Sequence, residues 1–260
     1  MNFFFSLSAE GVKATLHIPK FQNSGKRCGD LKLFEALIVN EKWVVKQPSS
    51  VIESKDFLSL TQPIDQSVYF YGRDCDVLKI LDENQLLDVE CFTDTQPDFR
   101  CNLRIDNLKG GFSSYQSEYP FRMIKTLSSL YSECGLLSQP SASRVGLFIR
   151  NIHCNPVTSA RKLFLYCDEV NELLDTFVVN LNRSTFIDLT QYKDRLESCF
   201  VYAKDFLGIP IYMTESKNGL ISMEHTHPPH EAIRGAEKFH LVQEFKKRID
   251  EKISQKTNKN

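Results

Sequence analysis

The chain has 260 residues, of which 42% are hydrophobic and 25% charged, a composition typical of ordinary globular proteins. Its 32 basic and 33 acidic side chains nearly cancel, so no excess of positive charge favours a nucleic-acid partner. No stretch approaches the roughly 18 apolar residues of a membrane span, and residues 1–7 lack the basic start of a signal peptide. We therefore expect a cytoplasmic protein without a membrane partner.

The first hundred residues predict short β-strands separated by turns. Val, Ile, Phe and Tyr are abundant in them and favour a pleated sheet surface over a helix face. Glycines and prolines, such as Gly25 and Pro48, punctuate the intervals. The candidate strands in this half are FFFSL, VKATLHI, LKLFEALIV, KWVVK, SVYFYG and FRCNLRI.

The pattern changes over residues 120–137, where Met123, Leu127 and Leu130 recur at helical spacing after Pro120. This spacing predicts one central helix, which ends near Gly135. The polar run SQPSAS follows and is a candidate domain boundary. Two β-rich domains, residues 1–137 and 138–260, are therefore one interpretation, and a single continuous domain is the other.

Strands resume after this boundary, and the chain is expected to end in an amphipathic helix. The Asn218-Gly219 pair predicts a hairpin between IPIYMTES and LISMEHTH. From Ala236 onward, apolar residues including Phe245 and Ile249 form one helical stripe. The predicted fold class is mainly β (α+β), with antiparallel sheets in a β-sandwich or barrel-like arrangement. The other candidate strands are RVGLFIRNIH, ARKLFLYC, LDTFVVNLN, STFIDL and SCFVYAK.

Eight cysteines are spread along the chain without a C-x-x-C pair. In a reducing cytoplasm they are expected to remain thiols. Cys167 and Cys199 lie in apolar strand-like runs, where a thiol commonly packs as a small hydrophobic group. Cys154 follows His153, but adjacent residues on a strand face opposite ways, so packing is favoured over a nucleophilic role.

A histidine cluster at the end of the last candidate strand carries the strongest chemical signal. Side chains alternate along a strand, so His225 and His227 are expected on one face. Two prolines follow and are expected to fold His230 and Glu231 back over the strand. Imidazoles with a carboxylate suit a divalent transition metal such as zinc, iron or manganese. The three histidines are thus candidate metal ligands and Glu231 a candidate fourth ligand or general base.

Two other interpretations of this cluster remain open. The histidines could serve only the structure, through hydrogen bonds to one another and to backbone carbonyls, or they could act in acid–base chemistry without a metal. Gly219, His225, His227 and Glu231 also resemble the first half of the first cupin motif, in which a glycine, two histidines and a glutamate lie on a barrel hairpin. Gly235 comes too early for that motif's closing glycine, and too little chain follows for a second motif. The chain is therefore not assigned to the cupins.

A second candidate segment, residues 110–120, is expected to form a glycine-led loop that enters the central helix. Tyr115, Gln116 and Tyr119 could stack on a sugar and hydrogen-bond to it. The alternative is an ordinary loop whose aromatic rings hold the helix on the sheet. It contains neither of the glycine patterns of phosphate-binding loops.

These observations leave two functions open. One is a metal-binding β-protein that acts on a small polar substrate, such as a sugar derivative. The other is a non-catalytic binding or assembly module for a glycan or protein partner, in which the histidine cluster is structural. The first needs the imidazoles to face a pocket, and the second needs their nitrogens to be occupied by the protein itself.

Overall fold

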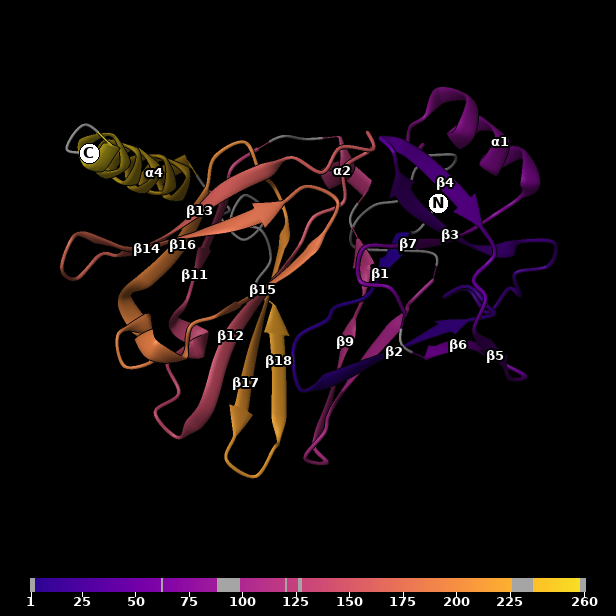
Figure 1. The fold of residues 1–260 in the computed structure, drawn as a ribbon, viewed down its shortest axis with the longest axis horizontal. Coiled ribbons are helices and arrows are strands. Elements are labelled where there is room, and N and C mark those ends of the chain that lie inside the picture. Colours follow the sequence, from indigo (N-terminus) through magenta and orange to yellow (C-terminus); the bar gives the residue numbers. More distant parts are fainter. Residues whose placement is uncertain are drawn as a thin grey trace.

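The computed structural model describes residues 3–61, 63–87, 99–119, 121–125, 128–225 and 236–257, which are mainly β (Figure 1). Every pairing between its named strands is antiparallel, as the sequence predicted, and the strands form four sheets. The sheets follow one another like the blades of a four-bladed propeller, and not as the predicted sandwich or barrel. Strand alternation in the sequence specifies which faces are buried, but it does not specify how many sheets share them.

The N-terminal half forms two sheets of five strands. Sheet N1 has the order β10 (Glu118–Tyr119), β1 (Phe3–Phe5), β7 (Val68–Gly72), β3 (Lys32–Val39) and β4 (Lys42–Lys46). Sheet N2 has the order β5 (Val51–Glu53), β6 (Phe57–Thr61), β2 (Val12–Pro19), β8 (Asn102–Asn107) and β9 (Phe112–Gln116).

The C-terminal half forms two sheets of four strands. Sheet C1 has the order β11 (Leu130–Glu133), β16 (Cys199–Ala203), β13 (Ala160–Cys167) and β14 (Glu172–Asn180). Sheet C2 has the order β15 (Ser184–Asp188), β12 (Ala142–Arg150), β17 (Ile209–Ser216) and β18 (Ile221–His225). The short 3-10 helices of this half are η1 (Gly135–Leu137), η2 (Thr190–Tyr192) and η3 (Leu196–Ser198).

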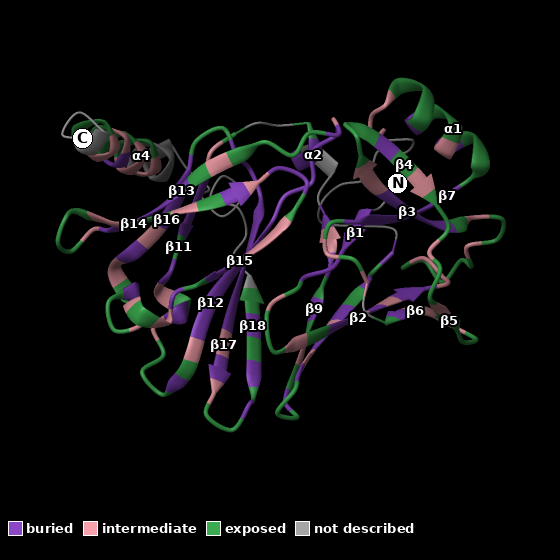
Figure 2. Ribbon diagram, viewed as in Figure 1, coloured by how far each residue is buried: buried purple, intermediate pink, exposed green. Residues whose placement is uncertain are grey.

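Sheet C2 is buried on both faces and joins the two halves (Figure 2). On β12, Leu147 and Ile149 pack into an apolar cluster shared with sheet C1, whereas Phe148 between them packs into the cluster shared with sheets N1 and N2. On β17, Tyr212 likewise packs into the cluster shared with sheet C1, and the adjacent Ile211 packs into the cluster shared with sheets N1 and N2. Strand alternation thus lets one sheet contribute to two cores.

The C-terminal helix is confirmed as α4 (Ala236–Thr257), and it packs on the outer face of sheet C1. Its Phe245 ring lies 5.6 Å from the ring of Phe200, which stacks on Tyr131 at 5.3 Å. Arg248 lies 3.3 Å from a carboxylate oxygen of Asp168. Among the described residues, no helix is both long and apolar enough to cross a membrane.

The predicted central helix over residues 120–137 is wrong in most of its length. Among the described residues of this range, α2 (Phe121–Ile124) is α-helical, and the chain later forms strand β11 and the short 3-10 helix η1. In β11 the adjacent residues Leu130 and Tyr131 face opposite sides, toward sheet C2 and toward α4. Both sides of β11 are apolar, so its sequence also satisfies a helical spacing.

The helix α1 (Asp74–Glu83) was not predicted. Its buried residues are Asp76 and Ile80, whereas Leu78 and Leu81 are exposed, so the sequence has no continuous apolar stripe. Asp76 accepts a hydrogen bond from the backbone N–H of Arg73 and so caps the start of the helix.

The division at residues 137 and 138 remains a prediction. It falls between η1 and β12, and β11 on one side of it pairs with β16 on the other. Phe148 and Ile211, from the second predicted domain, share an apolar cluster with Phe4 and Phe70 from the first.

Candidate functional site

The predicted metal site lies mostly outside the described residues. β18 ends at His225, whose backbone is opposite Ile211 of β17. His227, His230 and Glu231 follow in the stretch that the structure does not describe. In the described part of the chain, no group of three or more histidine, cysteine, aspartate or glutamate side chains is arranged to hold a metal ion. The metal site therefore remains a prediction.

The predicted sugar-binding segment forms strands β9 and β10, and not the expected loop into a helix. The rings of Tyr115 and Tyr119 are buried and lie 6.4 and 6.3 Å from the ring of Phe5. Gln116 is exposed, and its side-chain oxygen accepts a hydrogen bond from Arg100 at 3.3 Å. The two rings contribute to the core, so of the three residues only Gln116 lies on the surface.

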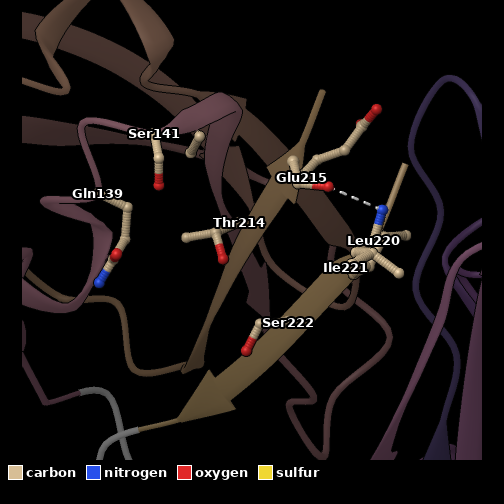
Figure 3. A pocket seen from close by; sticks show the side chains of 9 residues that line it. Gln139, Ser141, Thr214, Glu215, Leu220, Ile221 and Ser222 are labelled. Atoms are coloured by element: carbon tan, nitrogen blue, oxygen red, sulfur yellow. Dashed lines mark hydrogen bonds between the residues drawn. The ribbon is translucent and has the colours of Figure 1, made fainter. Parts of the chain in front are cut away.

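A pocket of about 200 Å³, with both polar and apolar side chains in its lining, opens beside the β17–β18 hairpin (Figure 3). The hydroxyls of Ser141, Thr214 and Ser222 and the amide of Gln139 point toward one space. Gln139 and Ser141 come from the segment between η1 and β12, and the other two from β17 and β18. The full lining is Gln139, Ser141, Ala142, Thr214, Glu215, Ser216, Leu220, Ile221 and Ser222.

The hairpin turn fixes one wall of this pocket. Gly219 has a φ of 81°, a left-handed conformation that glycine adopts without strain, and its N–H donates to the carbonyl of Ser216 at 3.0 Å. The next N–H, from Leu220, donates to the Ser216 hydroxyl at 3.1 Å, as the dashed line in Figure 3 marks. Ser216 therefore holds the turn, while Thr214 and Ser222, which are opposite each other in register, present their hydroxyls to the pocket.

The only charged residue in the described pocket lining, Glu215, is neutralised by Lys109 from the β8–β9 turn. Lys109 Nζ lies 2.6 Å from a Glu215 carboxylate oxygen, and strand alternation directs this side chain away from Thr214. Burial raises the pKa of Glu215, but hydrogen bonds from Lys109 and Asn107 outweigh burial and leave the pKa below its ordinary value. The carboxylate thus stays charged and paired, and the pocket presents uncharged hydrogen-bonding groups.

An apolar edge forms part of this pocket. Leu220 lines the pocket and is 65% exposed. The β8–β9 hairpin reaches this edge, because a Cβ placed on Gly111 would lie 2.8 Å from the Cα of Leu220. Phe112 follows Gly111 and is 57% exposed, with the Arg104 guanidinium 4.1 Å above its ring. Hydroxyl groups and exposed apolar side chains are therefore neighbours at this place.

Comparisons with protein families, with well-characterised proteins and with solved structures found no match. The pocket could not be predicted from the sequence, because Ser141 lies in a run interpreted as a domain boundary, and Thr214 and Ser222 lie in strands where alternate residues are commonly polar. The one signal in the sequence is that three of the polar positions in the two hairpin strands carry hydroxyls, at Thr214, Ser216 and Ser222.

Proposed function

We propose that this protein is a binding module that takes an uncharged, hydroxyl-rich group, such as the sugar of a glycan, in the pocket beside the β17–β18 hairpin. The observation that carries this proposal is the chemistry of the lining. Three hydroxyls and one carboxamide, from Ser141, Thr214, Ser222 and Gln139, converge on one hollow. Each can both donate and accept hydrogen bonds, as the hydroxyls of a neutral saccharide require.

The charge balance at the pocket also favours a neutral ligand. Glu215 is already paired with Lys109, so a charged ligand would meet no opposite charge from these two residues. The exposed side chain of Leu220 offers an apolar surface to the carbon-bound hydrogens of a sugar ring. Small-molecule sites commonly combine apolar surface with a few placed polar groups.

Binding of neutral oligosaccharides to the full chain, screened by saturation-transfer NMR, tests this proposal. Replacing Thr214 by Val or Ser222 by Ala removes one hydroxyl from the pocket and should weaken binding about fivefold, since one hydrogen bond contributes on the order of 1 kcal/mol. Ser114→Ala, which removes an exposed hydroxyl of β9 outside the pocket, is the matched control and should bind like the wild type. If the Thr214→Val and Ser222→Ala variants bind the oligosaccharide as tightly as the wild type, the proposal is contradicted.

A metal centre on the histidine cluster is the second candidate function. The observation that favours it is the position of His225 as the last residue of β18, two residues before His227 in the sequence. We propose zinc, iron or manganese as the metal, bound by His225, His227 and His230, with Glu231 as a fourth ligand or a general base. Elemental analysis of natively purified protein should show one equivalent of metal, reduced in His225→Ala and His227→Ala. Metal-free wild-type protein would exclude this candidate.

A further inference from the structure

Three buried cysteines lie in a row across sheet C1. Cys134 follows β11, Cys199 begins β16 and Cys167 ends β13, and these three strands are neighbours in the sheet (Figure 1). All three side chains belong to the apolar cluster between sheets C1 and C2, so they share one face of the sheet. All three are free cysteines.

Cys167 and Cys199 are directly opposite each other in the antiparallel register. The N–H of Asp168 donates to the carbonyl of Ser198 at 2.9 Å, so the hydrogen-bonded positions are 168 and 198. Positions 167 and 199 therefore form a non-hydrogen-bonded pair, where Cα atoms are about 4.5 Å apart and side chains approach most closely. This separation lies within the range that a disulfide spans.

Cys134 sits on the other side of Cys199 in a different kind of pair. Its backbone N–H donates to the Cys199 carbonyl at 2.8 Å, so this is a hydrogen-bonded position, where Cα atoms are about 5.5 Å apart. Side chains at such positions are farther apart than at the 167–199 pair. The register therefore favours Cys167 over Cys134 as the partner of Cys199.

We propose that Cys167 and Cys199 are a site of reversible oxidation, at which a disulfide forms between β13 and β16. The oxidant is a low-molecular-weight disulfide such as oxidised glutathione. One protein thiolate attacks it and releases one small thiol, and the second protein thiolate then displaces the other. The protein sulfurs together lose two protons and two electrons, and the small disulfide is reduced to two thiols.

The surroundings of the pair make this oxidation slow. Burial, together with a smaller effect of the neighbouring Cys167, raises the pKa of Cys199 to about 12, so few thiolates exist at neutral pH. Both side chains are almost completely buried, at 0% and 1% exposure. Reaction therefore depends on transient opening of the sheet, and the exposed Cys75 should react with the oxidant first.

The test treats the full-length Cys75→Ser variant with oxidised glutathione for several hours, alkylates the remaining thiols in denaturant, and digests the protein without reduction. Mass spectrometry should find the peptides of Cys167 and Cys199 linked and Cys134 alkylated. Thermal unfolding should shift upward by on the order of 5 °C, because the cross-link restricts the unfolded chain, and dithiothreitol should reverse the shift.

Two results would overturn the proposal. One is recovery of both Cys167 and Cys199 as alkylated thiols after an exposure that fully modifies Cys75 in the wild-type protein. The other is a linked peptide that joins Cys199 to Cys134. A Cys134→Ser variant serves as the matched control and should keep the 167–199 link, whereas Cys167→Ser should lose it.

Discussion

Glu118 on β10 is a carboxyl group whose charged form the fold disfavours. Its side chain is 12% exposed and accepts a hydrogen bond from the Cys101 N–H at 2.6 Å, with Arg100 3.8 Å away. Burial outweighs both of these interactions and raises the pKa of Glu118 from 4.5 to about 7. Between pH 4.5 and 7 the folded protein keeps a proton that the unfolded chain releases, so stability falls as the pH rises through this range.

Replacing Glu118 by Gln should therefore stabilise the protein at pH 8, by on the order of 2 kcal/mol, with little change at pH 4. The amide oxygen can still accept the Cys101 N–H bond, so the comparison isolates the charge. Urea denaturation at the two pH values measures the effect. The same substitution at exposed Glu83 is the control. An equal effect of Glu118→Gln at both pH values would show that burial does not raise this pKa.

At the level of single residues, the sequence could indicate where chemistry is possible but not which groups meet. The spacing of His225 and His227 is visible in the chain, whereas the convergence of Ser141 with Thr214 and Ser222 depends on how the segment after η1 returns to the hairpin. The proximity of the three thiols could not be predicted for the same reason, since Cys134, Cys167 and Cys199 are far apart in sequence.

Among the structural elements, the two hairpins that bound the candidate site meet through glycines. A Cβ on Gly111 would lie 2.0 Å from the carbonyl oxygen of Gly219, a contact with backbone that no rotation relieves. Gly111→Ala should therefore push the β8–β9 and β17–β18 hairpins apart and cost about 2 kcal/mol of stability. Gly135→Ala is the control, because the nearest atom to its Cβ lies at an ordinary 3.5 Å. Urea unfolding of both variants measures the difference, and equal stabilities would contradict this contact.

The C-terminal helix α4 is held by an aromatic contact with sheet C1. Phe245→Ala removes the ring that lies against Phe200 and should lower stability by about 2 kcal/mol, since the side chain is partly buried. Thermal unfolding followed by circular dichroism measures the change. Exposed Glu244→Ala on the same helix is the control and should unfold like the wild type. No loss in Phe245→Ala would mean that α4 does not depend on this contact.

Helices and strands whose apolar residues recur at a single spacing could be predicted from the sequence. Those whose apolar residues fit more than one spacing, or are few, could not. The alternation in β14 and the helical stripe of α4 were both recognised, because one face of each is apolar. β11 was mistaken for helix because apolar side chains occupy both of its faces, and α1 was missed because it buries few residues.

For the whole molecule, Arg150 at the end of β12 joins the two halves. It is completely buried and donates hydrogen bonds to the carbonyls of Ser67 and Asp65 at 2.9 Å and to that of Asn182 at 3.4 Å. Burial lowers the pKa of Arg150 to about 10, so it stays charged at neutral pH. Its guanidinium group thus links β12 to the segment that precedes β7.

Arg150→Met should lower the free energy of unfolding by about 3 kcal/mol, because buried carbonyls lose their donors. Chemical denaturation measures the loss, and limited proteolysis should show faster cleavage near residues 65–67. Arg183→Met, at an exposed position, is the control and should behave like the wild type. Wild-type stability in Arg150→Met would show that the halves are held together without this residue.

The central functional claim is that a neutral saccharide binds in the hydroxyl-lined pocket. NMR titration of isotope-labelled full-length protein with a neutral oligosaccharide measures this directly. We expect concentration-dependent shifts of the backbone amides of Thr214, Ser216 and Ser222, while the amide of Ser114 stays unchanged. Shifts confined to other strands, or none at millimolar saccharide, would contradict it.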